Sequence, residues 1–370
     1  MQFSISREML LQPLQSISGA VEKRQTLPIL SHIFIDVSEQ NELTLIGTDL
    51  EVEIKVSFPL ETAGESGTTT IPARKFFDLS KALQDGSDIK LQVDENRAIV
   101  RSGKSRFTLS TLPADDFPRV DEIEEVAVIN ELSQSTLKRL LHKTQFSMAQ
   151  QDVRYYLNGL LLELEEYDLH LVATDGHRLA FARRTMETDY GEKKQIIIPR
   201  KAVQELMRIL DDSDDPVTLK IGSNHLQATV GQLTITTKLI DGRYPDYDRV
   251  IPKEGQRTLL ADKERFRSAI SRVSILSNEK YRGIRMAMDP QGVAIHANNP
   301  DQEEAEEELQ VTYSGESMEI GFNSAYMMDA LSVVDEQEVM LYFIDENSSS
   351  LIHTEDEMEE YKFVVMPMRL

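Results

Sequence analysis

The sequence predicts an α+β protein in which one domain is repeated three times. Three segments share a strand followed by a helix at a spacing of about 125 residues, TTIPARKFFDLSKAL, IIIPRKAVQELMRIL and MEIGFNSAYMMDALSVV. This period exceeds that of solenoid repeats and suits a domain with its own core. We predict domains at residues 1–126, 127–254 and 255–370. Further landmarks keep nearly the same step: Thr48, Thr174 and Asn298; Leu30, Leu157 and Tyr281; and Arg106, Gln232 and Glu360.

Each copy is expected to run strand, helix, several strands, helix, several strands, which is α+β order rather than alternating β–α units. Windows at residues 6–24, 133–151 and 262–282 read as the first helices, and each opens on a capping residue, Ser6, Ser133 or Asp262. Each window also carries a stripe that predicts one packed and one wet face: Leu10, Leu14 and Ile17; Leu137, Leu141 and Thr144; Phe266, Ile270 and Val273.

The second helices of the first two copies, at residues 74–83 and 200–208, follow Pro72 and Pro199. Proline suits the first helical turn because its missing N–H has no partner there. The strands alternate with a period of two, which predicts antiparallel sheets with one buried and one solvated face, as in Phe107, Leu109 and Thr111 or in Leu233, Ile235 and Thr237.

Composition predicts a protein of the cytoplasm. The 370 residues are 40% hydrophobic, and no stretch approaches the roughly 20 apolar residues of a membrane span. Near the N-terminus, Arg7, Glu8 and Pro13 interrupt the apolar run that a signal peptide needs. The chain has no cysteine, which excludes disulfides, thiolate zinc sites and cysteine nucleophiles.

The charge is strongly negative overall but positive in the predicted helices. The chain carries a formal charge of −23, from 40 Lys and Arg against 63 Asp and Glu. The five helical windows named above hold 18 of these cations and only 7 of the acids. Surface helices often carry Lys and Arg, but recurrence at equivalent places in the copies favours a shared basic face that meets nucleic acid.

Known catalytic motifs are absent from the sequence, which has no GxxxxGKS or GxxxxGKT loop, no GxSxG turn, no HExxH and no GxGxxG after a strand. In ATDGHRLA, Asp175 and His177 could form an acid/base pair, and a hydrolase or transferase that uses them is the alternative from another class. The first copy has GTDLEVEI at this place, without a histidine. We therefore favour a turn in which Asp175 accepts backbone N–H bonds and Gly176 supplies backbone freedom.

Three surface groups remain that an ordinary core does not require. The run from Gln151 to Tyr156 suits phosphate contact and base stacking, although Tyr155 or Tyr156 could instead be half-buried core. The methionine-rich C-terminus suits a peptide-binding surface, although strand core is the commoner role. The basic SGKSRF at 102–107 offers a charge complement to the acidic PDQEEAEEE at 300–308, whose other interpretation is a solvated face.

The sequence resembles the bacterial DNA polymerase III beta subunit family, the sliding clamps, along its full length. The most specific motifs are TLPIL, GTDLE, PARKFFD, SRFTLSTLPADDFP, TQFSMAQQDVRYYLNG, ATDGHRLA, DGRYPDY, ILSNEKYRG, ANNPDQEEAEE, VTYSG and VVMPMRL. The resemblance implies three clamp-type domains per chain and a head-to-tail homodimer closed into a six-domain ring, with antiparallel sheets outside and paired helices inside. Such a ring encircles double-stranded DNA without sequence specificity, and twelve helices about 10 Å wide leave room for a duplex.

The resemblance implies a processivity factor without catalysis, cofactor, metal or membrane partner. Its implied partners are the replicative polymerase, the clamp loader and other proteins that carry a short hydrophobic clamp-binding peptide. Its implied place is the cytoplasm, associated with the nucleoid. A scaffold that never encircles DNA is a further alternative, and retention on circular against linearised DNA distinguishes the two.

Matching motifs carry three sets of site residues over to this sequence. The resemblance implies DNA contacts by Arg24, Arg74, Lys75, Gln151, Tyr155, Tyr156, Arg200 and Lys201. It implies a peptide pocket formed by Leu157, Thr174, Gly176, His177, Arg178, Leu179, Pro245, Arg249, Val250, Val364, Met366, Pro367, Met368 and Arg369. It implies a dimer interface in which Lys104, Arg106 and Phe107 of one protomer meet Ile275, Leu276, Glu303, Glu304, Glu306 and Glu307 of the other.

Three departures from the family pattern lie near these sites. Asp248 stands where the pattern has a basic residue beside the pocket, and the hairpin HTEDEMEEYK is more acidic than the pattern suggests. The third copy has Asn323, Ser324 and Tyr326 where the other copies have a basic pair. We expect an altered charge preference at the rim of the pocket and an uneven lining of the hole.

Overall fold

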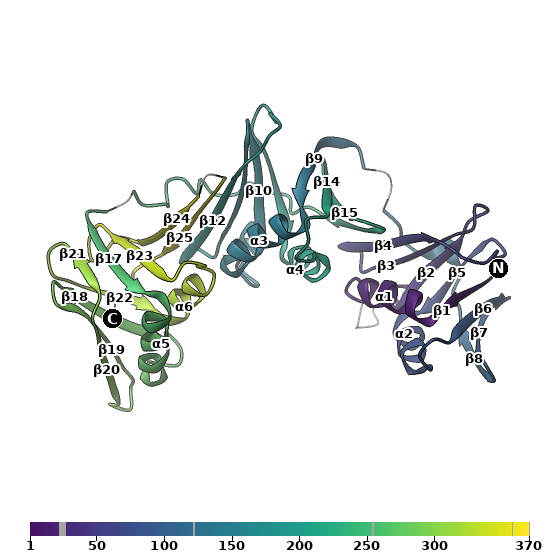
Figure 1. Ribbon diagram of the computed structural model, residues 1–370, viewed down its shortest axis with the longest axis horizontal. Coiled ribbons are helices and arrows are strands. Elements are labelled where there is room, and N and C mark those ends of the chain that lie inside the picture. The colour runs from purple at the N-terminus through teal and green to yellow at the C-terminus, as the bar shows by residue number, and fades with distance from the viewer. Residues whose placement is uncertain (22–26, 121–122, 254, 357, 370) are drawn as a thin grey trace. The chain divides into compact units, whose positions relative to one another are not determined.

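The computed structural model describes residues 1–21, 27–120, 123–253, 255–356 and 358–369, and each copy has the predicted order of elements (Figure 1). The first copy comprises β1 (Gln2–Ser6), α1 (Arg7–Ile17), β2 (His32–Val37), β3 (Glu42–Thr48), β4 (Val52–Pro59), β5 (Gly67–Pro72), α2 (Ala73–Ala82), β6 (Asp88–Asp94), β7 (Arg97–Ser102) and β8 (Ser105–Ser110). The second comprises β9 (Glu125–Ser133), α3 (Gln134–Thr144), β10 (Gly159–Glu165), β11 (Asp168–Thr174), β12 (Arg178–Thr185), β13 (Lys194–Pro199), α4 (Arg200–Ile209), β14 (Pro216–Gly222), β15 (His225–Val230) and β16 (Leu233–Lys238). The third comprises β17 (Arg257–Asp262), α5 (Lys263–Val273), β18 (Gly283–Asp289), β19 (Gly292–Asn298), β20 (Glu304–Leu309), an additional short β21 (Thr312–Ser314), β22 (Met318–Asn323), α6 (Ser324–Ser332), β23 (Glu338–Phe343), β24 (Ser350–Glu355) and β25 (Glu359–Val365).

Local sequence sets the start of the first helix in each copy, as predicted. Ser6 Oγ, Ser133 Oγ and Asp262 Oδ1 each accept the backbone N–H three residues further on, at 3.3, 3.2 and 2.9 Å. The nine side chains of the predicted stripes are all buried. The helices are shorter than the predicted windows, because short 3-10 turns, η3 (Gln145–Ser147) and η5 (Ser274–Leu276), follow α3 and α5.

The second helices of the first two copies begin directly after Pro72 and Pro199, as predicted, but each proline ends a strand and does not lie in the first helical turn. Pro72 ends β5, pairs with His32 and is the N-cap of α2, while Pro199 ends β13 and α4 begins at Arg200. A fixed φ near −65° fits either side of a strand–helix junction, so the sequence alone does not separate the two places. In the third copy Asn323 takes this position, and its Oδ1 accepts the N–H of Ala325 at 2.9 Å.

Two sheets join strands of successive copies. An eight-stranded sheet, in the order β5-β2-β3-β4-β16-β15-β14-β9, joins the first copy to the second through β4 and β16. A nine-stranded sheet, in the order β13-β10-β11-β12-β25-β24-β23-β17-β21, joins the second to the third through β12 and β25. Two four-stranded sheets, β1-β6-β7-β8 and β20-β19-β18-β22, complete the first and third copies. Within the described residues, β8 and β20 are edge strands with one neighbour each.

The strand register corrects one landmark of the repeat. Cross-strand partners run Leu91–Val100–Phe107 in the first copy, Leu219–Ala228–Ile235 in the second and Leu341–Ile352–Phe363 in the third. Phe107 therefore corresponds to Ile235 and Phe363, so the predicted equivalence of Arg106 with Gln232 and Glu360 is shifted by two residues. A shift of two keeps every side chain on the same face, and alternation alone does not detect it.

Strand β8 does not bury one face, contrary to the prediction from its alternation. Phe107 is 36% exposed, and Leu109 is half-buried. The equivalent strand β16 does bury Ile235 and Thr237, although Thr236 between them is buried as well. The two strands differ because β16 has β4 as a second neighbour and β8 has none among the described residues.

Contacts divide the chain into two compact units: a first unit of Met1–Lys138 and Gln204–Leu239, and a second unit of Arg139–Val203 and Ile240–Leu370. In the first unit, α1 and α2 pack together and contact strands β2 to β5. In the second, α5 packs on α6 and contacts β17, β19 and β20. Each joining sheet ties part of the second copy to its neighbour. The predicted domain boundaries at 126 and 254 stay a prediction.

Candidate peptide-binding and DNA-contact sites

The segment from Thr174 to Arg178 forms a tight turn between β11 and β12. Thr174 Oγ1 accepts the N–H of Gly176 at 3.1 Å, and Asp175 Oδ1 accepts the N–H groups of His177 and Arg178 at 2.9 and 3.1 Å. Gly176 has a φ of +89°, a conformation that L-residues disfavour. The predicted turn is confirmed, and the carboxylate of Asp175 serves the backbone and the Arg178 guanidinium instead of the His177 ring.

Arg178 is fixed by four groups around it. Its guanidinium donates to Asp175 Oδ2 at 3.0 Å, to Asp329 Oδ2 at 2.5 Å and to the Phe146 carbonyl at 2.8 Å. It also lies over the ring of Tyr326 at 4.5 Å, and the His177 ring stacks on the same tyrosine with centroids 6.3 Å apart. These contacts hold the turn against α6, so the exposed His177 has a defined orientation.

An apolar cluster lies beside this turn and contains much of the predicted pocket. Its buried members include Leu157, Leu179 and Val364, and Val250 packs against it. Thr174 is buried, while Gly176 and Arg178 are half-buried. Met366 N–H donates to the His177 carbonyl at 2.9 Å, which holds the C-terminal segment to the turn. Of the remaining predicted residues, Met366, Pro367 and Met368 are half-buried and Pro245, Arg249 and Arg369 are exposed.

Two tyrosines that support this cluster were missed from the sequence. Tyr244 is buried and its hydroxyl accepts the N–H of Thr174 at 3.1 Å, while Tyr247 donates to Glu163 Oε1 at 2.7 Å. Burial raises the pKa of both hydroxyls, so both remain protonated at neutral pH. Both tyrosines lie in the DGRYPDY motif, in which two aromatic residues stand among polar ones.

Glu163 is a buried carboxylate beneath the cluster. Burial by itself raises its pKa, but hydrogen bonds from His170, Tyr247, Gln195 and Lys193 outweigh burial and lower the pKa to about 2. The His170 ring nitrogen lies 3.0 Å from Glu163 Oε1, as does Lys193 Nζ. Glu163 is therefore ionised at neutral pH and links β10, β11 and the segment that carries Tyr247.

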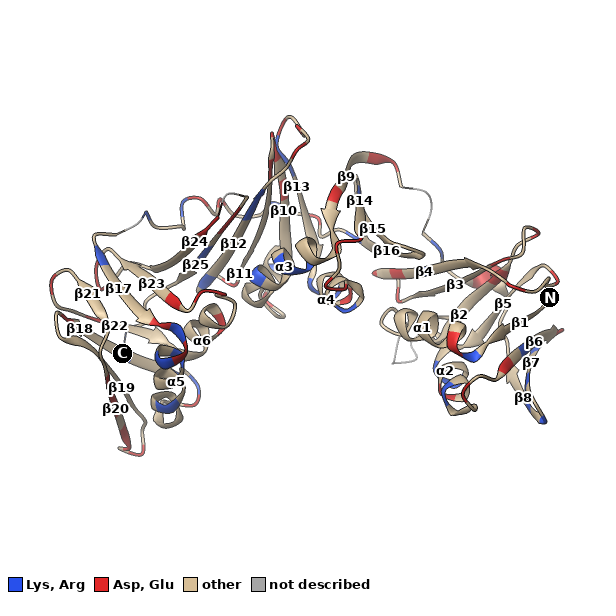
Figure 2. Ribbon diagram, in the orientation of Figure 1, with Lys and Arg blue, Asp and Glu red and all other residues tan. Residues whose placement is uncertain are grey.

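The residues predicted to contact DNA occupy different environments, and Arg24 lies outside the described residues. Arg74 and Lys75 are exposed on α2, as are Gln151 and Tyr155 after α3. Figure 2 shows Lys and Arg on α2, α3, α4 and α5, whereas α6 contains neither residue.

Tyr156, Arg200 and Lys201 are all half-buried. Tyr156 packs on the apolar cluster and meets the exposed Tyr155 edge-on at 5.8 Å. The interpretation as half-buried core therefore holds for Tyr156 but not for Tyr155. Arg200 donates to the Met148 carbonyl at 2.9 Å, which ties the start of α4 to the segment after α3.

The residues predicted for the dimer interface lie on or beside the two edge strands. Lys104, Arg106 and Phe107 are exposed at β8, while Glu303, Glu304 and Glu306 are exposed at β20. Ile275 lies in η5 beside β20 and is 76% exposed; Leu276, next to it, is half-buried. The carboxylate of Glu307 is held by the guanidinium of Arg272 of the same chain, at 2.9 and 2.5 Å.

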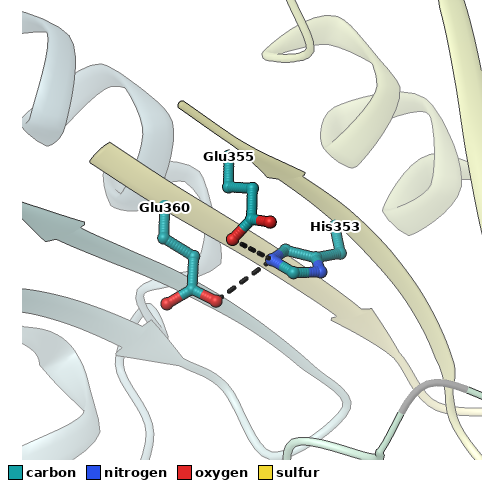
Figure 3. A group of neighbouring side chains, drawn as sticks. All are labelled: His353, Glu355 and Glu360. Carbon is teal, nitrogen blue, oxygen red and sulfur yellow. Dashed lines mark ion pairs between the residues drawn. The ribbon is translucent and has the colours of Figure 1, made fainter. Parts of the chain in front are cut away.

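One group of side chains in the described residues has the composition of a metal site. Figure 3 shows His353 and Glu355 on β24 with Glu360 on β25, and their ligand atoms all lie within 4.8 Å of one another. His353 Nε2 lies 3.0 Å from Glu360 Oε1, and Lys362 Nζ lies 2.6 Å from the same oxygen. The lysine already supplies a cation to this carboxylate, so the charge network explains the group. That the chain needs no metal stays a prediction.

These features define a class of protein: an α+β chain of three like domains whose successive copies are joined by shared sheets. The first unit has a basic edge strand, and the second unit has an acidic edge strand. The second unit also has an apolar cluster beside a rigid turn. None of the helices in the described parts of the chain has the length and apolar content that a membrane crossing requires. Domain models of the DNA polymerase III beta subunit match residues 1–121 for the N-terminal domain, 131–246 for the central domain and 248–369 for the C-terminal domain. The chain belongs to the DNA polymerase III beta subunit family, and its function is that of a sliding clamp.

Relatives match over the whole chain. The chain is 50% identical over 370 residues to the beta sliding clamp of Pseudomonas putida and 48% identical over 371 residues to that of Escherichia coli, with 100% of each protein covered. Among solved structures, the sliding clamp of Pseudomonas aeruginosa bound to griselimycin matches with a TM-score of 0.95 at 49% identity. That of Bartonella birtlesii bound to griselimycin matches with a TM-score of 0.93 at 36% identity, and both matches cover 100% of each chain.

Proposed function

We propose that two copies of this chain close head to tail into a six-domain ring that encircles duplex DNA. The supporting observation is the pattern of sheet joints. In each of the first two copies, four strands follow the first helix, and the third of these strands pairs with the last strand of the next copy. In this way β4 pairs with β16, and β12 pairs with β25. Continuing the pattern, β20 pairs with β8 of the partner subunit. A head-to-tail contact of this kind closes into a ring when the rotation fits.

The observed register predicts which residues face each other in this third joint. Ile54 pairs with Ile235 in the first joint and Ala180 with Phe363 in the second. Ile54 pairs with the residue directly before the repeat landmark Thr48, and Ala180 with the residue directly before Thr174. Ala305 pairs with the residue directly before Asn298, the third landmark, so Ala305 is the equivalent of Ile54 and Ala180. Phe107 is the equivalent of Ile235 and Phe363, as described above. The expected facing pairs are Phe107 with the partner's Ala305, Arg106 with the partner's Glu306 and Lys104 with the partner's Glu308.

Charge and apolar exposure support this register. It sets Arg106 of β8, and Lys104 in the turn just before that strand, opposite carboxylates of β20, and opposite charges across an antiparallel pair are favourable. It also covers Phe107, the exposed aromatic residue of β8. We expect Ile275 to pack at the same interface, and replacement of Ile275 and Leu276 by aspartate to give monomers in sedimentation. The control is Ile344→Asp, at an isoleucine that is 45% exposed elsewhere.

The cationic helices suit contact with DNA inside such a ring. Lys and Arg distributed over several helices attract phosphates without fixing a sequence or a register. Retention is then topological, so tight contacts are unnecessary, and the acidic remainder of the chain discourages binding of DNA elsewhere. Exposed Arg74, Lys75, Gln151 and Tyr155 are the described side chains that we expect to meet DNA.

We further propose that the apolar cluster and the turn at 174–178 bind a short hydrophobic peptide carried by the replicative polymerase, the clamp loader and other partners. An apolar floor with polar groups at its rim suits such a peptide. Two structural relatives bind griselimycin. In this role the chain is a processivity factor of the cytoplasm and nucleoid, and it performs no reaction of its own.

Retention on DNA tests the proposal. Protein loaded by a clamp loader onto nicked circular DNA should stay bound through gel filtration in high salt, because the ring cannot leave a circle. After the circle is cut once, the protein should slide off the free ends. Equal retention on circular and linear DNA would support the scaffold alternative and overturn encirclement.

A further inference from the structure

The turn at residues 48–52 in the first unit repeats the hydrogen bonds of the turn at 174–178. Thr48 Oγ1 accepts the N–H of Leu50 at 3.1 Å, and Asp49 Oδ1 accepts those of Glu51 and Val52 at 3.0 and 2.8 Å. Lys238 N–H donates to the Glu51 carbonyl at 3.0 Å, just as Met366 N–H donates to that of His177 at 2.9 Å. The same backbone arrangement is therefore built twice in the chain.

Part of the apolar cluster of the second unit has an equivalent in the first unit. Phe34, Ile46 and Phe117 form a buried cluster in the first unit. By strand register and sequence these residues take the places of Leu161, Val172 and Tyr244 in the second unit. The rings of Phe34 and Phe117 lie 5.6 Å apart, so this cluster is packed through aromatic contact.

A cavity of about 450 Å³ lies beside the first turn, within the first unit. Sites of 300–1,000 Å³ hold small ligands or a few side chains. Its wall includes Leu50, Val52, Glu53, Arg119, Ile123 and Lys238.

Leu50 lines this cavity in a strained conformation. Its φ is +77°, which costs a residue with a side chain about 1–2 kcal/mol, and the second turn has Gly176 at this position. The leucine side chain is nevertheless 43% exposed, so burial does not offset that cost. Strain that holds an apolar side chain at an open cavity is typical of a binding position.

Glu53 gives the cavity its charge preference. It is 8% exposed and takes the place of Leu179, and its Oε2 accepts the N–H of Val120 at 3.0 Å. Among the described residues no Lys or Arg lies within ion-pair distance of its carboxylate, and burial raises its pKa. Arg119 of the same wall lies over the Phe34 ring at 5.1 Å. Lys55 and Arg119 act on this carboxylate only at longer range and lower its pKa less than burial raises it. A buried carboxylate with one hydrogen-bond donor and no ion-pair partner among the described residues favours a cationic ligand.

We propose that this cavity is a second peptide site, which takes a short segment with a leucine-like side chain next to a lysine or arginine. The apolar side chain packs on Leu50, Val52 and Ile123, and the cation pairs with the Glu53 carboxylate. The inference rests on the proposed function only in taking the turn at 174–178 as part of a peptide site. The repeat supplies the shared scaffold, and side chains make the two sites selective for different ligands.

The test uses the full chain with labelled Leu, Val and Ile methyl groups, observed by NMR. The probe is a capped synthetic hexapeptide with two leucines flanked by lysines, and the control peptide has glutamates in place of the lysines. The lysine peptide should shift the methyl resonances of Leu50, Val52 and Ile123. Glu53→Gln should weaken this binding about fivefold or more, because a charged hydrogen bond is lost. Glu42→Gln, at the other end of β3, should leave it unchanged.

The outcomes separate this site from the proposed peptide site of the second unit. Shifts confined to Leu157, Leu179 and Val364 would overturn the peptide site proposed beside Leu50. They would leave the peptide site proposed for the second unit standing. Equal binding of both peptides, or equal affinity in the wild-type chain and Glu53→Gln, would overturn the assigned ligand class. Leu50→Ala serves as a second variant, and its full retention of binding would also contradict the proposal.

Discussion

The turns at 48–52 and 174–178 share their backbone hydrogen bonds and differ in all four residues that follow the shared threonine and aspartate. Threonine and aspartate set the same hydrogen bonds in both, and a residue at or just after the end of a strand of the next copy donates to the equivalent carbonyl. The first turn continues with Leu50, Glu51, Val52 and Glu53, while the second continues with Gly176, His177, Arg178 and Leu179.

The comparison shows that the repeat keeps the residues of the joint between sheets and changes the side chains of the two proposed peptide sites. Both turns lie where sheets of successive copies meet, so the shared residues are those that the joint needs. The second turn lies beside a large apolar cluster, whereas the first lies beside a smaller one with a buried acid. We therefore expect the ligand preference of each proposed site to depend on a few substitutions on a common scaffold.

The largest effect is expected when the second turn is made to resemble the first. Leu179→Glu places a carboxylate without a partner in the apolar cluster, which costs about 3 kcal/mol or more. We expect a lower melting temperature and a loss of about 100-fold in affinity for a hydrophobic peptide, measured by fluorescence anisotropy. The reciprocal Glu53→Leu should leave that affinity unchanged. Binding within threefold of the wild type in Leu179→Glu would contradict the assignment.

Acid should lower the free energy of unfolding of the second unit more than that of the first. The pKa of Glu163 is lowered to about 2 in the folded chain, so its stabilisation is full above the unfolded pKa near 4.3 and is lost as pH falls toward 2. Burial raises the pKa of Glu53, so its ionised form opposes folding and that penalty disappears as pH falls. Hydrogen exchange between pH 5 and 3, corrected for intrinsic rates, should therefore accelerate more in β10 and β11 than in β3 and β4.

The control for this acid effect is Glu163→Gln, which removes the titrating carboxylate. We expect the difference between the two units to shrink in this variant, while stability at neutral pH falls because the ion pairs of Glu163 are lost. The same acceleration in both units of the wild-type chain would contradict the account.

A moderate effect is expected at His177. The ring is exposed and stacks on Tyr326, so His177→Ala should change the free energy of unfolding by less than about 0.5 kcal/mol. It should weaken the hydrophobic peptide about fivefold to tenfold, because the rim of the site loses a stacked ring. His142→Ala, an exposed histidine of α3, is the matched control. Unchanged peptide affinity in His177→Ala would remove this residue from the site.

The smallest effects compare the backbone of the two turns. A Cβ on Gly176 would lie 2.9 Å from Arg154 Nη1 and face a φ of +89°, so Gly176→Ala should destabilise by about 1–2 kcal/mol. Leu50→Gly relieves a φ of +77° and should stabilise by up to about 1 kcal/mol. Chemical denaturation measures both. Destabilisation by Leu50→Gly would show that the leucine is held by contacts rather than strained.

Local signals in the sequence predicted much of this structure. The N-caps at Ser6, Ser133 and Asp262 and the turn at Asp175 were predictable because they depend on neighbours within a few residues. Leu157, Leu179 and Val364 were placed in one cluster by resemblance, and the structure brings them together. The roles of Tyr244, Tyr247 and Glu163 depend on contacts between distant segments, which no local pattern reports.

The joining sheets mark the limit of sequence reasoning. The pairings of β4 with β16 and of β12 with β25 connect residues more than a hundred positions apart, and alternation specifies a face but not a neighbour. For the same reason β8 could not be recognised as an edge strand. Its alternation is that of a paired strand, and the proposed ring gives it the missing neighbour.

Closure of the ring can be tested by cross-linking the third joint, since the chain has no cysteine of its own. The register sets Thr108 opposite Glu304 of the partner subunit, with Cα atoms about 5 Å apart. A short thiol cross-linker added to the double variant Thr108→Cys and Glu304→Cys should give one product of twice the chain mass. Thr108→Cys with Glu306→Cys, shifted by two residues, should react far less. Equal reaction of both variants, a ladder of larger multimers, or no dimer would contradict the account.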